Sequence, residues 1–174
     1  MKDLLSIKAF AFDIDGVATD GGVFCNGEGD LLRTYDAKDG FAIRMAVLHG
    51  YPVAVITGGS SESIRKRMVT SGVAPEDVFL HCRDKREQFA LFCERYGLQP
   101  REVMYFGDDV PDMAVMQSCG CGVCPSDAVE EVKEIADWIS SRPGGKGCLR
   151  ECIETTLRAQ GQWTFDAAEY KRKF

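Results

Sequence analysis

An apolar run that ends in two closely spaced carboxylates constrains this chain more than any other feature. Residues 7–12 read Ile-Lys-Ala-Phe-Ala-Phe, and Asp13, Asp15 and Gly16 come directly after them. A short apolar run bounded by a glycine turn is typical of a buried central strand. In an open parallel sheet, ligands bind beyond the carboxyl ends of the strands. The pattern therefore predicts that Asp13 and Asp15 lie at the ligand-binding edge of such a sheet.

Two carboxylates at the end of a buried strand are costly unless a cation or a substrate proton compensates them. The alternative interpretation is an ordinary loop aspartate followed by a helix N-cap. Groups at the ends of other strands can decide between these interpretations.

The length and the charge of the chain limit its fold and its partners. Its 174 residues suit a single domain, which we expect to cover residues 1–174. The net charge is −6, and only residues 171–173 form a basic cluster, which argues against non-specific nucleic-acid binding. No stretch has the ~18 to 20 apolar residues of a membrane span, and the first residues lack the apolar centre of a signal peptide. We therefore expect a cytoplasmic protein with neither nucleic-acid nor membrane partners.

The chain has eight cysteines, for which we expect free thiols, because the apolar content is high enough for a core without disulfides. Cys119, Cys121 and Cys124 could offer three thiolates to zinc or to an iron–sulfur cluster. No fourth ligand is nearby in sequence, and the segment has the small apolar character of a buried strand, so we favour a packing role. Cys148 and Cys152 are four residues apart on a predicted helix and are also expected to pack.

Short apolar runs alternate with helical segments along the rest of the chain. This alternation predicts the α/β class, here a Rossmann-like three-layer sandwich with a central parallel sheet. Asp39 is the predicted N-cap of the first helix, and Ser60 or Ser61 is that of the second. The predicted strands are 7–12, 52–56, 78–81, 103–106 and 121–124, and the predicted helices are 40–49, 60–72, 84–96, 111–118, 127–139 and 149–160.

Two segments outside this alternation have their own patterns. Two β-like arms around Asn26-Gly27 predict a hairpin at about residues 21–35, which would project over the active edge of the sheet. Residues 140–147 form a glycine-containing loop, after which a C-terminal helix and tail occupy residues 149–174. No linker separates these parts.

Polar groups follow the other predicted strands at corresponding positions. Thr57 follows the second strand, Lys85 follows the third, and the sequence Gly-Asp-Asp-Val-Pro-Asp at 107–112 follows the fourth. Carboxylates from two loops can hold Mg²⁺, while a hydroxyl and an ammonium group neutralise phosphoryl oxygens. Each signal is weak alone, but the set at one sheet edge predicts a phosphoryl-transfer site.

On these motifs, Asp-Ile-Asp-Gly-Val at 13–17, Thr57, Lys85 and 107–112, the chain resembles the haloacid dehalogenase superfamily of phosphohydrolases. The resemblance covers nearly the whole chain. It implies that Asp13 is a nucleophile that forms an aspartyl-phosphate, and that Asp15 protonates the leaving oxygen and then activates water. It further implies Mg²⁺ held by the carboxylates of Asp13 and Asp108 and by the backbone carbonyl of Asp15. Thr57, Gly58 and Lys85 would bind the phosphoryl group, while Asp109 and Asp112 would orient Lys85 and the metal.

Within this superfamily, the chain is most similar to capless members that hydrolyse octulosonate phosphates. The similarity rests on Asp-Gly-Val-Ala-Thr-Asp-Gly-Gly at 15–22, on 38–40, and on the loop 144–147 before Arg150. It implies a small sugar-acid phosphate substrate and a homotetramer in which neighbouring subunits complete each site. A related nonulosonate phosphate or another small sugar phosphate is the alternative substrate.

The basic residues Arg67, Lys146 and Arg150 are candidates for binding the carboxylate of a sugar acid, because guanidinium groups suit carboxylates. The alternative is that all three are solvated surface charges. Gly59 stands where many relatives have Arg or Glu, so a side chain that would face the sugar is missing, and Arg67 could compensate for it.

Two other functional classes have some of the same features. A response-regulator receiver also has clustered aspartates, a threonine and a lysine, but its phospho-acceptor aspartate follows the third strand, where this chain has His81-Cys82-Arg83. A non-catalytic oligomerisation or sensing module is the other alternative, since a fold does not by itself define a function. The complete set of Asp13, Asp15, Lys85 and Asp108 argues against it.

Overall fold

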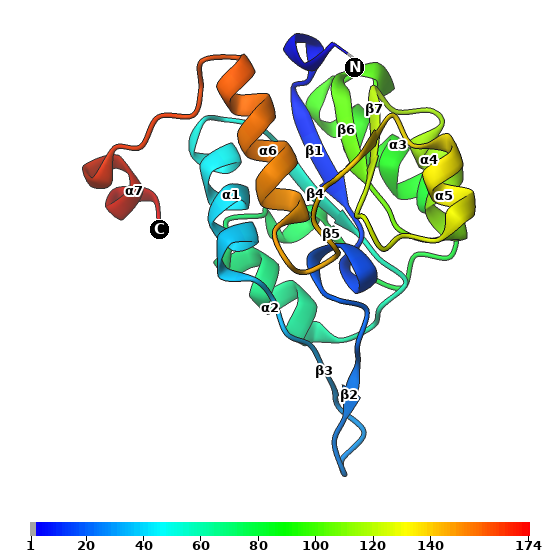
Figure 1. Cartoon of the computed structure of the whole chain (residues 1–174). Coiled ribbons are helices and arrows are strands. Elements are labelled where there is room, and N and C mark those ends of the chain that lie inside the picture. The colour runs from blue at the N-terminus through cyan, green and yellow to red at the C-terminus, as the bar shows by residue number, and fades with distance from the viewer. Residues whose placement is uncertain (1–2) are drawn as a thin grey trace.

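A computed structural model describes residues 3–174 and contains one six-stranded parallel sheet (Figure 1). The strand order is β5-β4-β1-β6-β7-β8, so the first strand of the chain lies in the interior of the sheet. All five pairs of neighbouring strands are parallel, which confirms the predicted fold class. The strands are β1 (Ala9–Phe12), β4 (Val53–Ile56), β5 (Val78–Phe79), β6 (Val103–Phe106), β7 (Cys121–Cys124) and β8 (Trp138–Ile139).

Helices cover both faces of the sheet and make three layers (Figure 1). Alternate residues of β1 show the two faces: Phe10 and Phe12 pack in the core under α1, α2 and α6, while Ala9 and Ala11 pack in the core under α3, α4 and α5. The helices are α1 (Ala37–Leu48), α2 (Glu62–Thr70), α3 (Lys85–Tyr96), α4 (Met113–Met116), α5 (Glu130–Ile135), α6 (Cys148–Ala159) and α7 (Ala167–Lys173).

The register of the sheet brings three loops together at its carboxyl edge. Phe12, the last residue of β1, pairs with Val55 of β4 on one side and with Phe106 of β6 on the other. The loops that follow β1, β4 and β6 therefore begin side by side. This register places the predicted site motifs next to one another.

Helix α1 begins earlier than predicted. Asp36 is its N-cap and accepts hydrogen bonds from the backbone N–H groups of Lys38 and Asp39. The predicted cap, Asp39, instead lies inside the first turn, where it is 2 % exposed. Its carboxylate accepts hydrogen bonds from the backbone N–H groups of Gly147 and Arg150, at the start of α6. A capping pattern cannot separate two aspartates three residues apart, because either could accept from a first-turn N–H.

The predicted helix 127–139 is wrong in its second half. Helix α5 ends at Ile135, and Trp138–Ile139 pairs with β7 as the edge strand β8. The backbone N–H of Asp137 donates to the Gly122 carbonyl, and the Gly122 N–H donates back to the Asp137 carboxylate. These contacts with β7 join residues that are far apart in sequence, which local propensity cannot indicate.

The predicted hairpin is present and projects away from the sheet (Figure 1). Strands β2 (Phe24–Cys25) and β3 (Leu31–Leu32) pair in antiparallel fashion, and the side chain of Asn26 accepts hydrogen bonds from two N–H groups of the turn. We call residues 21–35 the flap. Contrary to the prediction, the flap does not line the cavity at the sheet edge, and within residues 3–174 no separate cap domain is present.

The C-terminal segment packs on α1. Phe41 of α1 contacts the rings of Trp163, Phe165 and Tyr170, and Arg44 donates to the Tyr170 hydroxyl. None of the helices formed by residues 3–174 combines the length and the apolar character needed to cross a membrane.

Candidate active site

The carboxyl edge of the sheet contains a half-open cavity of about 350 Å³. Loops after β1, β4 and β6 and the start of α3 form its walls. Every residue that the sequence predicted for phosphoryl transfer lines it, together with four additional residues. The lining residues are Asp13, Asp15, Thr57, Gly58, Gly59, Cys82, Arg83, Lys85, Asp108, Asp109, Pro111 and Asp112.

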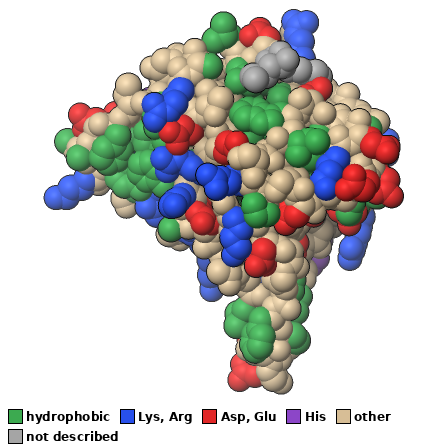
Figure 2. Space-filling model, in the orientation of Figure 1, with side chains coloured by type: hydrophobic (Ala, Val, Ile, Leu, Met, Phe, Trp, Pro, Cys, Tyr) green, Lys and Arg blue, Asp and Glu red, His purple; other side chains and the backbone are tan. Residues whose placement is uncertain are grey.

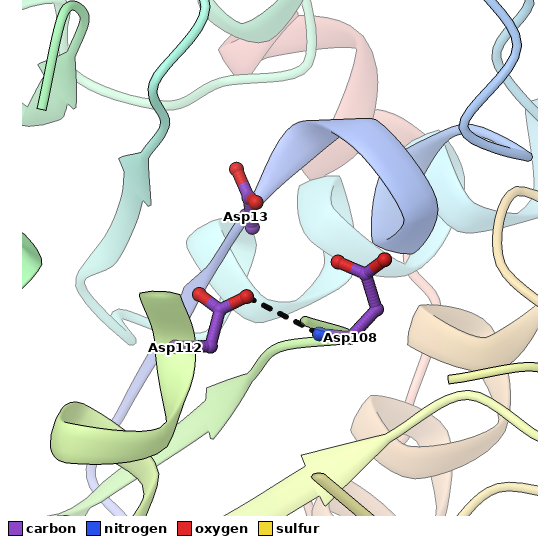
Figure 3. Close-up of side chains that lie close together, drawn as sticks. All are labelled: Asp13, Asp108 and Asp112. Atoms are coloured by element: carbon purple, nitrogen blue, oxygen red, sulfur yellow. Dashed lines mark hydrogen bonds between the residues drawn. The ribbon is translucent and has the colours of Figure 1, made fainter. Parts of the chain in front are cut away.

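Three aspartates converge at the bottom of this cavity (Figure 3). Asp13 follows β1, whereas Asp108 and Asp112 follow β6. One carboxylate oxygen of each lies within 4.8 Å of the others. The Asp108 backbone N–H donates to Asp112 at 3.3 Å, so part of this cluster is fixed by the turn after β6.

Lys85 is the cation of the cluster and the first residue of α3. Its ammonium group lies 2.7 Å from Asp13 Oδ2 and 2.7 Å from Asp112 Oδ1, and its side chain is 5 % exposed. Burial lowers the pKa of Lys85, but the charges of Asp13 and Asp112 outweigh this effect and raise it overall. Lys85 therefore stays charged while it holds two carboxylates from different loops.

Asp112 is fully buried and bridges two donors. It accepts a hydrogen bond from Lys85 and one from the hydroxyl of Tyr105 at 2.6 Å. Asp109, by contrast, is exposed and accepts from the neighbouring Val110 N–H. Of the two predicted orienting residues, only Asp112 thus contacts Lys85. Sequence reasoning missed Tyr105, because nothing marks a strand tyrosine as different from its apolar neighbours.

The cluster has more negative than positive charge. Burial, and then the nearby carboxylates of Asp112 and Asp13, raise the pKa of Asp108 to about 7. Burial and the charge of Asp112 raise the pKa of Asp13 overall, although Lys85 acts to lower it. The Oδ1 atom of Asp108 is buried and has no hydrogen-bond partner among residues 3–174. Unpaired carboxylate oxygens in excess over cations are what a hard dication such as Mg²⁺ prefers, so the residues fit this metal.

Asp15 lies on the turn at Ile14–Ala18, beside the cluster. Gly16 on this turn has φ +87°, and a Cβ at this position would lie 1.9 Å from Asp108 Oδ2, so only glycine fits. The carboxylate of Asp15 is held by Arg33, whose Nε and Nη2 donate to its two oxygens at 2.6 and 2.9 Å. Sequence reasoning missed Arg33, because a basic residue at the base of a hairpin is ordinary.

Thr57 follows β4 and is 1 % exposed. Its Oγ1 accepts a hydrogen bond from the backbone N–H of Gly59 at 3.1 Å. The hydroxyl proton of Thr57 can therefore be donated to a ligand oxygen, and Gly58 lies beside it on the cavity wall.

The predicted carboxylate-binding residues lie outside this cavity. The guanidinium group of Arg67 stacks over the Tyr35 ring at 5.6 Å and donates to the Ser71 hydroxyl. Lys146 and Arg150 line a different cavity, and Arg150 is paired with Glu154. The structure thus brings together the phosphoryl-transfer residues but leaves these three basic residues elsewhere on the same chain.

The glycine loop before α6 has a structural role that the sequence did not indicate. A Cβ on Gly144 would lie 1.9 Å from the Gly16 carbonyl oxygen, and the Gly145 N–H donates to the Val17 carbonyl at 2.8 Å. These glycines allow the loop to support the turn that carries Asp15, rather than to approach a ligand.

The cysteine segment, Cys119 and strand β7, is buried as predicted. Burial raises the pKa of Cys119 to about 12 and that of Cys124 to about 11, which disfavours the thiolates that metals require. Among residues 3–174, the only group of three possible metal ligands is the aspartate cluster.

Known proteins are similar to this chain in sequence and in architecture. A family model described as haloacid dehalogenase-like hydrolase matches residues 61–147. The 3-deoxy-D-manno-octulosonate 8-phosphate phosphatase KdsC of Salmonella typhi is 31 % identical over 157 residues, which are 90 % of this chain and 82 % of the relative. The KdsC of Haemophilus influenzae is 32 % identical over 169 residues, 97 % of this chain and 93 % of the relative.

A solved structure extends this similarity to the fold. The crystal structure of 3-deoxy-D-manno-octulosonate 8-phosphate phosphatase from Moraxella catarrhalis, in complex with magnesium ion, phosphate ion and KDO, superposes with a TM-score of 0.88. It is 29 % identical, and the match covers 92 % of this chain and 91 % of that one. By sequence, by fold and by the arrangement of its strand-end residues, the chain belongs to the haloacid dehalogenase-like hydrolase family.

Proposed function

We propose that this chain is a Mg²⁺-dependent phosphatase that converts 3-deoxy-D-manno-octulosonate 8-phosphate into 3-deoxy-D-manno-octulosonate and phosphate, a step that supplies a lipopolysaccharide precursor. The observation that carries the proposal is the convergence of Asp13, Asp108 and Asp112 around Lys85 in one cavity. The proposed substrate is supported by relatives of that name that align along most of both chains.

In the first step, the Asp13 carboxylate attacks phosphorus and forms an aspartyl-phosphate while the bond to the sugar oxygen breaks. Asp15 gives its proton to that leaving oxygen. Lys85 and the Thr57 hydroxyl donate hydrogen bonds to the phosphoryl oxygens as their charge develops. The contact between Lys85 and Asp13, at 2.7 Å, supports a shared role for them at the phosphoryl group.

In the second step, the Asp15 carboxylate takes a proton from water, and the resulting hydroxide attacks phosphorus. The bond to Asp13 breaks, so phosphate leaves, Asp13 is regenerated as a carboxylate and Asp15 is protonated again. Asp112, which contacts both Lys85 and Tyr105, keeps the ammonium group in place through both steps.

Mg²⁺, when bound, would neutralise charge on the phosphoryl group and on the carboxylates around it. The Asp13 and Asp108 carboxylates and the Asp15 backbone carbonyl would hold it. The unpartnered Oδ1 of Asp108 supports this assignment.

The test is phosphate release by the purified chain with and without Mg²⁺. The substrates are octulosonate 8-phosphate, a nonulosonate 9-phosphate, glucose 6-phosphate and 4-nitrophenyl phosphate. We expect Mg²⁺-dependent hydrolysis with the highest kcat/KM, by at least about tenfold or 1.4 kcal/mol, for octulosonate 8-phosphate. A preference for the nonulosonate would identify the alternative substrate. Inactivity on all four would favour a non-catalytic module.

We further propose one domain over residues 1–174 that assembles as a cytoplasmic homotetramer. Phe24 and Leu32 of the flap are 66 % and 47 % exposed and form an apolar patch on the projecting arm (Figure 2). A two-stranded hairpin is marginal alone, which favours packing against another subunit. Seven buried cysteine side chains support a reducing compartment.

Arg67, Lys146 and Arg150 remain proposed contacts for the substrate carboxylate. Because none of them lines the cavity of its own chain, such contacts would have to form across a subunit interface. Arg67→Ala and Arg150→Ala would then lower kcat/KM for octulosonate 8-phosphate, but not for 4-nitrophenyl phosphate, which has no carboxylate.

A further inference from the structure

One side chain of the flap contacts a residue that lines the cavity. Arg33 follows β3 directly, and its guanidinium group donates two parallel hydrogen bonds to the two carboxylate oxygens of Asp15, at 2.6 and 2.9 Å. This fork-to-carboxylate geometry fixes both the position and the plane of the carboxylate. It connects two segments that are 18 residues apart in the chain.

The guanidinium group is confined on its other sides. The Arg33 side chain is only 3 % exposed, although the flap around it is exposed. Its Nη1 donates to the Leu31 carbonyl at 3.3 Å. A Cβ at position 59 would lie 3.4 Å from Arg33 Nη2, so the guanidinium group packs against the backbone of Gly59.

Asp15 has few other restraints. The Thr19 hydroxyl approaches one of its oxygens at 3.5 Å, and the Asp15 side chain is 32 % exposed to the cavity. A carboxylate on a surface turn would otherwise sample several rotamers. Proton transfer to the leaving oxygen and from water needs this group within hydrogen-bond reach of both.

We infer that Arg33 is a positioning residue that holds the Asp15 carboxylate in place for both proton transfers, and that the flap thereby takes part in catalysis. This inference rests on the proposed phosphatase function. Arg33 contacts Asp15 but does not line the cavity, so its effect would be transmitted through Asp15. Any partner that orders the flap would also order the acid and base of the reaction.

Transient kinetics of Arg33→Ala in the full-length chain tests the inference, because it separates the two half-reactions. With 4-nitrophenyl phosphate, the leaving group needs no proton, so we expect transfer to Asp13 to change less than about threefold. Hydrolysis of the aspartyl-phosphate needs Asp15 as a base and should slow by about ten- to a hundredfold. With octulosonate 8-phosphate, whose leaving oxygen needs a proton, both half-reactions should slow.

Further variants separate positioning from a general effect on the flap. Arg33→Lys should retain only part of the activity. The ammonium group keeps the positive charge, but it cannot donate two parallel hydrogen bonds to both oxygens of Asp15. Added guanidinium ion should partly restore Arg33→Ala. In an Asp15→Ala background, Arg33→Ala should cause no further loss, because the two residues act as one unit. Thr34→Ala, on the same segment, is the matched control and should resemble the unmodified chain.

Three results would overturn the inference. Unchanged hydrolysis of the aspartyl-phosphate in Arg33→Ala would remove Arg33 from the acid–base step. A raised KM for octulosonate 8-phosphate with unchanged kcat would assign Arg33 to the substrate instead. An unmodified chain that hydrolyses no phosphomonoester would refute the proposed function, and with it this inference, before any variant is compared.

Discussion

Asp13 is held on both of its carboxylate oxygens. Oδ1 accepts from the Ile14 backbone N–H at 2.6 Å, and Oδ2 lies 2.7 Å from the Lys85 ammonium group. A nucleophile fixed in this way loses little entropy on reaction. Asparagine has the same shape, but its amide has only one acceptor oxygen, so it would lose one of these two contacts.

Asp13→Asn should therefore abolish turnover and leave the fold intact. We expect kcat to fall by at least a hundredfold, about 2.7 kcal/mol of barrier, because an amide is a poor nucleophile. The measurement is Mg²⁺-dependent phosphate release, with thermal unfolding as a check of the fold. Asp20→Asn, on the exposed part of the same loop, is the control. More than about a tenth of the original kcat in Asp13→Asn would exclude Asp13 as the nucleophile.

Asp108 should lower the thermal stability of the metal-free chain but raise that of the chain with Mg²⁺ bound. Burial, and then the charges of Asp112 and Asp13, raise its pKa to about 7, so its ionisation is unfavourable in the metal-free chain. Asp108→Asn should therefore raise the metal-free Tm by a few degrees and remove most of the rise in Tm that Mg²⁺ causes. Asp109→Asn, at an exposed neighbouring carboxylate, should retain the rise. An equal response to Mg²⁺ in both variants would contradict the metal assignment.

At the scale of elements, a buried carboxylate connects two helices. Asp39 of α1 accepts two hydrogen bonds from the start of α6, and burial raises its pKa from 3.8 to about 6. The unfolded chain therefore loses this proton at a lower pH than the folded chain does. The contribution of Asp39 to stability must fall as pH rises from about 4 to about 6, by up to about 3 kcal/mol.

Asp39→Asn isolates this contribution, because the amide does not titrate. The variant loses one of the two hydrogen bonds at every pH, a constant cost of about 1 to 2 kcal/mol. The difference in unfolding free energy between the two chains should nevertheless shift in favour of the variant between pH 4.5 and pH 7. Denaturant titrations at several pH values would measure it. A difference that stays constant with pH would show that Asp39 is ionised throughout this range.

At the scale of the whole molecule, the flap is the part least supported by its own chain. Its residues Val23, Phe24 and Leu32 are exposed, and the Arg33 side chain connects its base to Asp15 in the proposed catalytic cavity. Packing of flaps between subunits would cover the apolar patch and exclude water from the site.

Phe24→Glu should weaken this assembly, because it places a charge in the proposed contact. Light scattering should give about four times the 19.2 kDa mass of one chain for the unmodified protein and a smaller mass for the variant. Glu28→Gln, at the polar tip of the flap, should leave the mass unchanged. A fully active monomer would refute the tetramer.

The grouping of the proposed catalytic residues in one cavity could be predicted from the sequence, because each of them follows a strand. Asp13, Thr57, Lys85 and Asp108 need no knowledge of distant contacts, since parallel strands bring their carboxyl ends to one edge. The same local patterns indicated the hairpin and most of the helices. They failed at β8 and at the start of α1, where pairing with Gly122 and contact with α6 decide the outcome.

The class of fold and the residue types at the strand ends follow from the amino-acid sequence alone, because hydrophobic periodicity and residue type are local properties. The groups that support these residues are known only from the folded chain. Arg33 of the flap contacts Asp15, and Tyr105 of β6 contacts Asp112. Gly144 packs against the turn at Ile14–Ala18, although the two are far apart in the sequence. Such contacts depend on the distance between side chains in the folded protein, which no local pattern specifies.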